Sequence, residues 1–249
     1  MTRETGPNEC AELTVESGVA ELRLADPERR NAFSPALGED LLSLMLAIDD
    51  RDDVSAVVLS SEGEAFCAGL DLTVLQGDDP EERAYMFDLL GAVIDWLYWS
   101  DRPIVVGARG AAPGGGSILI DASDIRVAGD DISMWWPEVA FGIPGHHIAA
   151  RLVSQVGWPR ATELMLLGDE APVGAEEARE IGLVNRVVAP EEVDETAREI
   201  AGVIAEHDRQ HGNVQSHLEA IHHAREELQG ASQAYSRWLS SDLGDVIRR

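Results

Sequence analysis

The chain has 249 residues, a length that suits one main α/β core carrying an appended element. With 45% hydrophobic and 26% charged residues its composition is globular, which argues against a disordered, fibrous or disulfide-rich protein. A formal net charge of −27 repels phosphate polyanions and anionic membrane surfaces. Nucleic acid and membranes are therefore poor candidate partners.

The charge balance is unusual in a second respect, because the sequence contains no lysine and its 19 basic residues are all arginine. Repulsion within so acidic a chain is tolerable when salt shortens the Debye length from ~10 Å at 0.1 M to ~3 Å at 1 M. The composition therefore resembles that of proteins from salt-loving archaea, which have a saline cytoplasm.

The N-terminal sequence MTRETGPNEC lacks a basic start followed by an apolar run, so we expect no secretory signal. No uncharged apolar run reaches the ~18 residues of a membrane span. Cys10 and Cys67 are too few for a disulfide framework or a cysteine-based metal site. These observations predict a cytoplasmic protein.

The first predicted elements are a hairpin and a helix. Residues 13–24 form two alternating runs that meet at Ser17-Gly18, a turn signal. Ser34 before Pro35 is a favourable N-cap and first-turn pair, and apolar residues then recur at helical spacing. The continuous apolar run 54–60 is too short for a helix and predicts a buried parallel strand.

A strand-then-helix order continues along the chain, which predicts an α/β fold. The further expected elements are a helix at 80–99 and strands at 103–108, 125–128 and 184–188.

The strand signals stop beyond Pro190, where 191–207 and 214–229 are expected to be acidic helices. We therefore divide the chain into a core, residues 1–190, and a C-terminal helical region, residues 191–249. Such a region packs against another subunit or forms a solvated layer within the chain.

Two glycine-bearing loops, 65–72 and 110–117, follow buried strands. Ligands bind at that edge of open α/β sheets. A helix that starts at the three glycines 114–116 directs free N–H groups and a positive dipole end there, which suits a developing oxyanion. The glycines alone are equally compatible with a tight turn.

Other catalytic motifs do not fit the sequence. A P-loop needs a lysine, and Ser117 lacks the closing glycine of a nucleophile elbow, so we interpret it as a helix-start hydroxyl. Cys67 is expected to be a small packing residue. His207 and His211 stand four apart without a third ligand, so no metal site is expected.

Six segments in order, spanning roughly residues 10–190, resemble the enoyl-CoA hydratase/isomerase (crotonase) family. The segments are 28–33 (ERRNAF), 65–72 (AFCAGLDL), Arg102-Pro103 leading to the three glycines, 123–126 (SDIR), 137–144 (PEVAFGIP) and 178–184 (AREIGLV). The resemblance implies a crotonase-like spiral of ββα units with a C-terminal helical trimerisation region. A homotrimer or homohexamer is therefore expected.

The resemblance also implies that the protein binds an acyl-CoA thioester and stabilises its enolate with two backbone N–H groups. By position these donors belong to Leu70 and Gly115, and such donors are typically worth ~3 to 4 kcal/mol each. The residues expected to border the CoA are Arg29, Arg30, Ala68, Gly69 and Asp71. No cofactor beyond the CoA of the substrate is implied.

The carboxylates decide the reaction within this family. Its hydratases hold one water between two glutamates, of which the second corresponds to Glu138, whereas Ile118 occupies the position of the first. A single base still suffices to move a proton from C2 to C4, as the Δ3,Δ2-enoyl-CoA isomerases of the family do. We therefore expect an isomerase with Glu138 as its proton carrier, unless Glu138 is an ordinary solvated or capping acid.

Further pocket candidates are His146 and the tryptophans. His146, with His147, could donate a proton to the product or simply cap a helix. Four tryptophans, Trp96, Trp99, Trp135 and Trp136, could shape an aromatic or bulky acyl site or pack in the core.

Three alternatives stay open at this level. The protein could be a hydratase of low activity, a crotonase of another reaction such as hydrolysis or decarboxylation, or a CoA-ester-binding subunit without catalysis. Turnover of enoyl-CoA separates the enzymes from the binding subunit.

Overall fold

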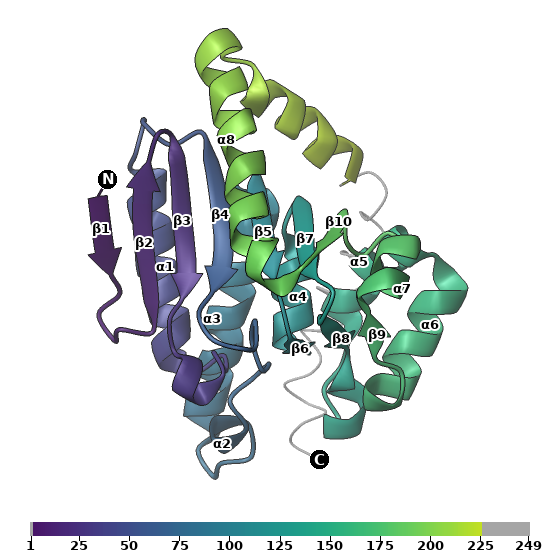
Figure 1. Ribbon diagram of the computed structural model, residues 1–249. Coiled ribbons are helices and arrows are strands. Elements are labelled where there is room, and N and C mark those ends of the chain that lie inside the picture. Colours follow the sequence, from purple (N-terminus) through teal and green to yellow (C-terminus); the bar gives the residue numbers. More distant parts are fainter. Residues whose placement is uncertain (1, 226–249) are drawn as a thin grey trace.

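The computed structural model describes residues 2–225, without the side chains of His146 and His147 (Figure 1). Its main sheet has the strand order β1-β2-β3-β4-β5-β7-β10, antiparallel from β1 to β3 and parallel from β3 onwards. These strands are β1 (Thr2–Thr5), β2 (Ala11–Glu16), β3 (Val19–Leu24), β4 (Ala56–Ser61), β5 (Ile104–Ala108), β7 (Ile125–Gly129) and β10 (Arg186–Val188). The predicted hairpin is confirmed, with Ser17 and Gly18 at its turn.

A second, small sheet lies where β5 ends. It contains β6 (Ala111–Pro113), β8 (Ser133–Trp135) and β9 (Val173–Gly174) in that order, and Figure 1 shows it below the main sheet. Because β6 leads directly into the glycines before α4, this small sheet holds one of the two predicted ligand loops in place.

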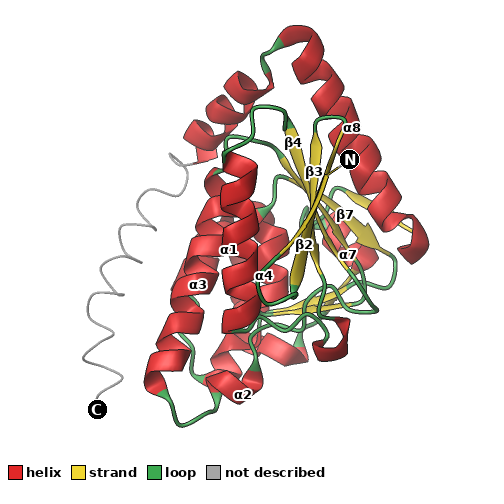
Figure 2. Ribbon diagram, turned by 90° about the vertical axis from the view of Figure 1, so that its left-hand side faces the viewer, coloured by secondary structure: helices red, strands yellow, loops and turns green. Residues whose placement is uncertain are grey.

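The helices form layers on the two faces of the main sheet, with α1, α3 and α4 on one face and α8 on the other (Figure 2). The helices are α1 (Pro35–Asp49), α2 (Leu72–Leu75), α3 (Pro80–Trp99), α4 (Gly115–Ala122), α5 (His146–Val156), α6 (Trp158–Leu167), α7 (Ala175–Glu180) and α8 (Val193–His211), with short 3-10 segments η1 (Pro27–Arg29), η2 (Pro137–Phe141), η3 (Gly168–Glu170) and η4 (Pro190–Glu192). Ser34 caps α1 as predicted, since its side chain accepts a hydrogen bond from the Leu37 N–H.

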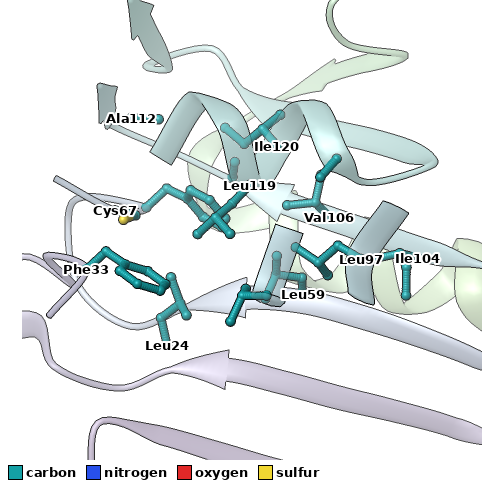
Figure 3. Packing of buried hydrophobic residues seen from close by; sticks show 14 of the residues in the cluster. Leu24, Phe33, Leu59, Cys67, Leu97, Ile104, Val106, Ala112, Leu119 and Ile120 are labelled. Atoms are coloured by element: carbon teal, nitrogen blue, oxygen red, sulfur yellow. The ribbon is translucent and has the colours of Figure 1, made fainter. Parts of the chain in front are cut away.

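The larger core lies between the sheet and the helices α1, α3 and α4. Figure 3 shows Phe33 and Leu59 packed beneath Leu119 of α4, close to the loop that carries Cys67. All four side chains are at most 1% exposed. The helix that begins at the glycines is thus anchored by its apolar face, which fixes the direction of its N-terminal N–H groups.

Helix α8 covers the opposite face of the sheet. Ala197, Ala201 and Ala205 recur every four residues and are buried. The first two pack in one cluster with valines of the central strands, and Ala205 lies against the hairpin turn at Gly18. The C-terminal region that begins at residue 191 therefore forms, as far as His211, a layer within the chain and not a detached appendage.

The next helical stretch described is 214–225, and the remainder of the predicted helix, 226–229, lies outside the described residues. Within residues 2–225, no helix is long and apolar enough to cross a membrane.

Candidate active site

Two backbone N–H groups converge at the edge of the sheet. Phe33 N donates to Gly69 O at 2.7 Å and Asp71 N donates to Phe33 O at 2.9 Å, which leaves Leu70 N between them. Neither Leu70 N nor Gly115 N, the first N–H of α4, has a hydrogen-bond acceptor in the part of the chain that the structure describes. A Cβ on Gly115 would lie 3.7 Å from Leu70 N, so the two donors face one small space.

Backbone-to-backbone packing explains the glycines of both loops. Gly69 has φ +82°, and a Cβ there would lie 2.9 Å from Pro113 O. A Cβ on Gly116 would lie 2.3 Å from Cys67 O, closer than any side chain tolerates. The glycines therefore do more than permit a turn, because they allow the two loops to approach one another.

The paired N–H groups open into a pocket of about 600 Å³. Of the residues expected at the site, the structure brings together in its lining Ala68, Gly69, Leu70, Gly115 and Glu138. The remaining wall is mostly apolar and consists of Leu72, Leu75, Pro113, Gly114, Ser133, Trp135, Pro137, Phe141, Ile143, Asp169 and Pro172.

Glu138 lies beside the N-terminus of α4, at the beginning of η2. A Cβ on Gly114 would lie 3.3 Å from Glu138 Oε1, and Glu138 Oε2 is buried without a hydrogen-bond partner among residues 2–225. Burial is the main cause that raises the pKa of this carboxyl; the charge of Asp121 raises it further, against the effect of a hydrogen bond from its own backbone. A carboxyl with a raised pKa is suited to take up and return a proton near neutral pH.

The structure does not place Trp96 or Trp136 in the wall of this pocket. Trp96 Nε1 donates to Asp49 Oδ2 at 2.9 Å and lines a different hollow, at the C-terminal end of α3. Trp136 is 1% exposed in the core, while its neighbour Trp135 lines the pocket because successive residues of an extended segment point to opposite sides. Of the two alternatives, packing therefore fits Trp96 and Trp136, whereas Trp135 lies in the pocket wall.

Ile118 and His146 are the other two pocket candidates. Ile118 is partly buried, packs against the core, and is not among the residues of the pocket wall. The backbone of His146 begins α5, but its side chain lies outside the described residues.

The expected CoA-binding residues fall into two groups. Asp71 is largely buried and structural, since it caps α2 by accepting from Thr73 N at 2.8 Å and pairs with Arg29. Burial acts to raise the pKa of Asp71, but the hydrogen bonds from Thr73 and the charge of Arg29 hold it below its usual range.

Arg30 is exposed, makes no ion pair with another described residue, and its carbonyl accepts from Ala68 N at 3.0 Å. Arg30 is thus held beside the pocket loop with its side chain available.

Three further expectations concern other reactive side chains. The Ser117 hydroxyl is buried and donates to the Ala112 carbonyl, so it fits a helix-start role. Burial raises the pKa of the Cys67 thiol to about 12, which keeps it protonated and unreactive. His207 and His211 belong to no cluster of three potential metal ligands within the described chain.

Sequence reasoning missed most of the apolar wall and Asp169. These residues come from α2, η2, η3 and the segment before β9, which meet only in the folded chain. Phe141 and Ile143 belong to the segment 137–144 that resembles the family, but nothing in their spacing along the sequence predicted that they line the pocket.

Comparison with known proteins agrees with this geometry. Residues 14–241 match the family described as enoyl-CoA hydratase/isomerase. The chain belongs to this family. A putative enoyl-CoA hydratase from Thermus thermophilus is 36% identical over 200 residues, which cover 78% of this chain and 77% of the relative. A short-chain-enoyl-CoA hydratase from Clostridium acetobutylicum is 33% identical over 195 residues, which cover 77% of this chain and 74% of the relative.

A solved structure extends the likeness to the fold. The enoyl-CoA hydratase/isomerase from Xanthobacter autotrophicus Py2 superposes with a TM-score of 0.83 at 30% identity, covering 94% of this chain and 86% of that one. The predicted crotonase-type α/β fold is therefore confirmed, and with it an enzyme of the enoyl-CoA hydratase/isomerase family.

Proposed function

We propose that this member of the enoyl-CoA hydratase/isomerase family is a Δ3,Δ2-enoyl-CoA isomerase with Glu138 as its proton carrier. The observation that carries the proposal is the placement of one half-buried carboxyl beside the Leu70 and Gly115 N–H groups, in a pocket whose wall does not include Ile118. Asp169, the other carboxylate of the wall, is exposed at its edge.

The reaction follows from these groups. A thioester oxygen that accepts hydrogen bonds from Leu70 N and Gly115 N gains charge when Glu138 takes a proton from C2 of a 3-enoyl-CoA. The resulting enolate is delocalised to C4, and the protonated Glu138 returns the proton there, which leaves the 2-enoyl-CoA and an ionised Glu138. No water takes part, so one carboxyl is sufficient.

The same proposal assigns the remaining contacts. The apolar wall accommodates the acyl chain, and the two arginines of the η1 loop, Arg29 and Arg30, lie at the pocket loop where a CoA phosphate would benefit from a positive charge. Arg29 already pairs with Asp71, so Arg30 is the better candidate for a phosphate.

Hydration of 2-enoyl-CoA is the second candidate, favoured by the names of the relatives, which are mostly hydratases. It requires a water to be held and activated, for which the family's hydratases use two glutamates, and Ile118 stands where the first would be.

The two candidates are separated by supplying a 3-enoyl-CoA and, separately, crotonyl-CoA to the purified protein and identifying the products by chromatography. We expect conversion of the 3-enoyl-CoA to its 2-enoyl isomer to be the faster reaction. In deuterated water, deuterium should enter C4 only to the extent that protonated Glu138 exchanges with solvent before it returns the proton. Rapid hydration of crotonyl-CoA would contradict the isomerase. Binding of both thioesters without turnover of either would instead indicate a CoA-ester-binding subunit.

A further inference from the structure

Asn31 is a buried polar side chain that the proposed reaction does not use. It is 0% exposed and is not among the residues of the pocket wall. Its Nδ2 donates hydrogen bonds to the carbonyl oxygens of Glu62, Ala65 and Phe66 at 2.9, 3.1 and 3.2 Å. Its Oδ1 accepts from Asp26 N at 2.9 Å. Both polar atoms of the side chain are therefore used, and every partner is a backbone group.

These hydrogen bonds join two loops that lie far apart in the sequence. The turn 26–31 precedes α1, whereas the donor loop, residues 62–72, follows β4 and carries the Leu70 N–H. The two loops are in contact, because a Cβ on Gly63 would lie 2.9 Å from Pro27 Cβ. Asn31 therefore fastens the first half of the donor loop to the turn.

The residues on either side of Asn31 hold the second half of the donor loop. Ala68 N donates to Arg30 O at 3.0 Å, and a parallel β-bridge pairs Phe33 with Leu70. Figure 3 shows Phe33 buried close to the part of the loop that carries Cys67. The direction of the Leu70 N–H thus depends on the backbone of residues 30–33.

The backbone of this segment has an uncommon conformation. Arg30 and Asn31 have φ values of 54° and 53°, in the left-handed region that residues other than glycine rarely adopt. Asparagine enters this region more readily than most residues, and arginine has no such advantage. Two such residues in succession persist only where the surrounding structure holds them, and such positions cluster at active sites. The hydrogen bonds of the Asn31 side chain supply part of that restraint.

We propose that Asn31 is a positioning residue of this active site, which holds the Leu70 N–H in the direction of the thioester oxygen. It acts through the backbone of 30–33 and the donor loop and does not touch the substrate. A donor stabilises developing charge most when it is in place before the reaction begins. An amide suits this task because one group both donates to carbonyls and accepts from an N–H, which a carboxylate cannot do. The inference rests on the proposed role of Leu70 N as a donor to the thioester.

The first test is the C=O stretching frequency of bound butyryl-CoA, ¹³C-labelled at the thioester carbon, measured by infrared difference spectroscopy. Hydrogen bonds from Leu70 N and Gly115 N should lower this frequency in the parent protein relative to free butyryl-CoA. Asn31→Gly removes the amide and accepts the left-handed backbone, and we expect a smaller shift in this variant. An unchanged shift would overturn the proposal. Absence of any shift in the parent would overturn the two donors themselves, so the two failures are distinguishable.

Ser17→Gly is the matched control. Ser17 also has a left-handed backbone, with φ 54°, but its exposed side chain lies at the hairpin turn. This variant should leave both the infrared shift and isomerase activity unchanged. In Asn31→Gly, kcat should fall by at least about tenfold with a smaller change in KM, because a displaced donor weakens the transition state most. Loss of folded protein also lowers kcat, so the infrared shift of the bound ligand is the deciding measurement.

The second test does not depend on the folding of Asn31→Gly. Asn31→Asp keeps the side chain's size and the acceptor for Asp26 N, and the new carboxyl donates to a backbone carbonyl only when it is protonated. Burial among carbonyl oxygens favours that protonated form. The infrared shift of butyryl-CoA should therefore increase as the pH is lowered, by more than it does in the parent. A pH dependence identical to that of the parent would overturn the proposal.

Discussion

At the scale of single residues, the raised pKa of Glu138 leads to a definite pH dependence. The carboxyl must be ionised to accept a proton, so isomerase kcat/KM should fall as the pH is lowered through its pKa. Because burial raises that pKa, the midpoint should lie above the ~4.3 of an ordinary glutamate. A kinetic profile from pH 4 to 8 measures the midpoint, and one at or below ~4.3 would contradict the assignment.

Removal of the base alone gives a second prediction at this scale. Glu138→Gln keeps the side chain's shape, and isomerase turnover should fall by ~10² to 10⁴, the usual contribution of general acid-base catalysis. Binding of the CoA ester, measured by calorimetry, should change little, since the Leu70 and Gly115 N–H groups are untouched. Near-full turnover in the variant would show that another group carries the proton, with His146 the next to substitute.

Ile118 provides the sharpest distinction between isomerase and hydratase. Ile118→Glu places a carboxylate at the sequence position where the family's hydratases keep one. Because Ile118 packs against the core and outside the pocket wall, the new side chain must turn towards the pocket to hold a water opposite Glu138. The gain should be partial, because nearby carboxylates raise one another's pKa and no neighbour is arranged to hydrogen-bond the new one. We expect hydration of a short 2-enoyl-CoA to rise by at least about tenfold, a barrier change of only ~1.4 kcal/mol. No gain in hydration would indicate that Ile118 is not what separates the two reactions.

At the scale of elements, the approach of α4 to the preceding loop depends on the absence of a side chain at Gly116. Gly116→Ala would force a Cβ to 2.3 Å from Cys67 O, so we expect the loop and helix to separate, with a lower melting temperature and loss of isomerase activity. Gly91→Ala is the matched control on α3, where a Cβ would meet nothing within 4 Å. That variant should be stabilised by ~0.5 to 1 kcal/mol, the helix preference of alanine over glycine. Equal melting temperatures for the two variants in thermal denaturation would contradict this account.

At the scale of the whole molecule, charge repulsion dominates the expected response to salt. The net charge of −27 opposes compaction, and added salt shortens the range of that repulsion. The melting temperature should therefore rise from 0.05 to 0.5 M KCl, a range in which screening changes strongly. Equimolar sucrose, which stabilises folded proteins by exclusion but screens no charge, is the control, and the rise in KCl should exceed the rise in sucrose. A melting temperature independent of KCl would argue against a salt-adapted chain.

How much of this molecule follows from its sequence depends on the range of the interactions involved. The start of α1 at Ser34-Pro35, the hairpin turn at Ser17-Gly18 and the helix after the three glycines were all predictable, because caps, turns and periodicity are decided within a few residues along the chain. The two backbone donors were expected at Leu70 and Gly115 through resemblance to a family.

Only the tertiary structure decided which side chains meet. The sequence did not distinguish between Trp135 and Trp136 as pocket residues, whereas in the folded chain Trp135 lines the pocket and Trp136 is buried in the core. Asp121 of α4 drew no attention in the sequence, because its burial depends on how α4 packs against residues far away along the chain. Which side chains become neighbours depends on how the helices and strands pack against one another. The free energy that favours one packing arrangement is distributed over the whole core, so it cannot be read from a few residues of the sequence.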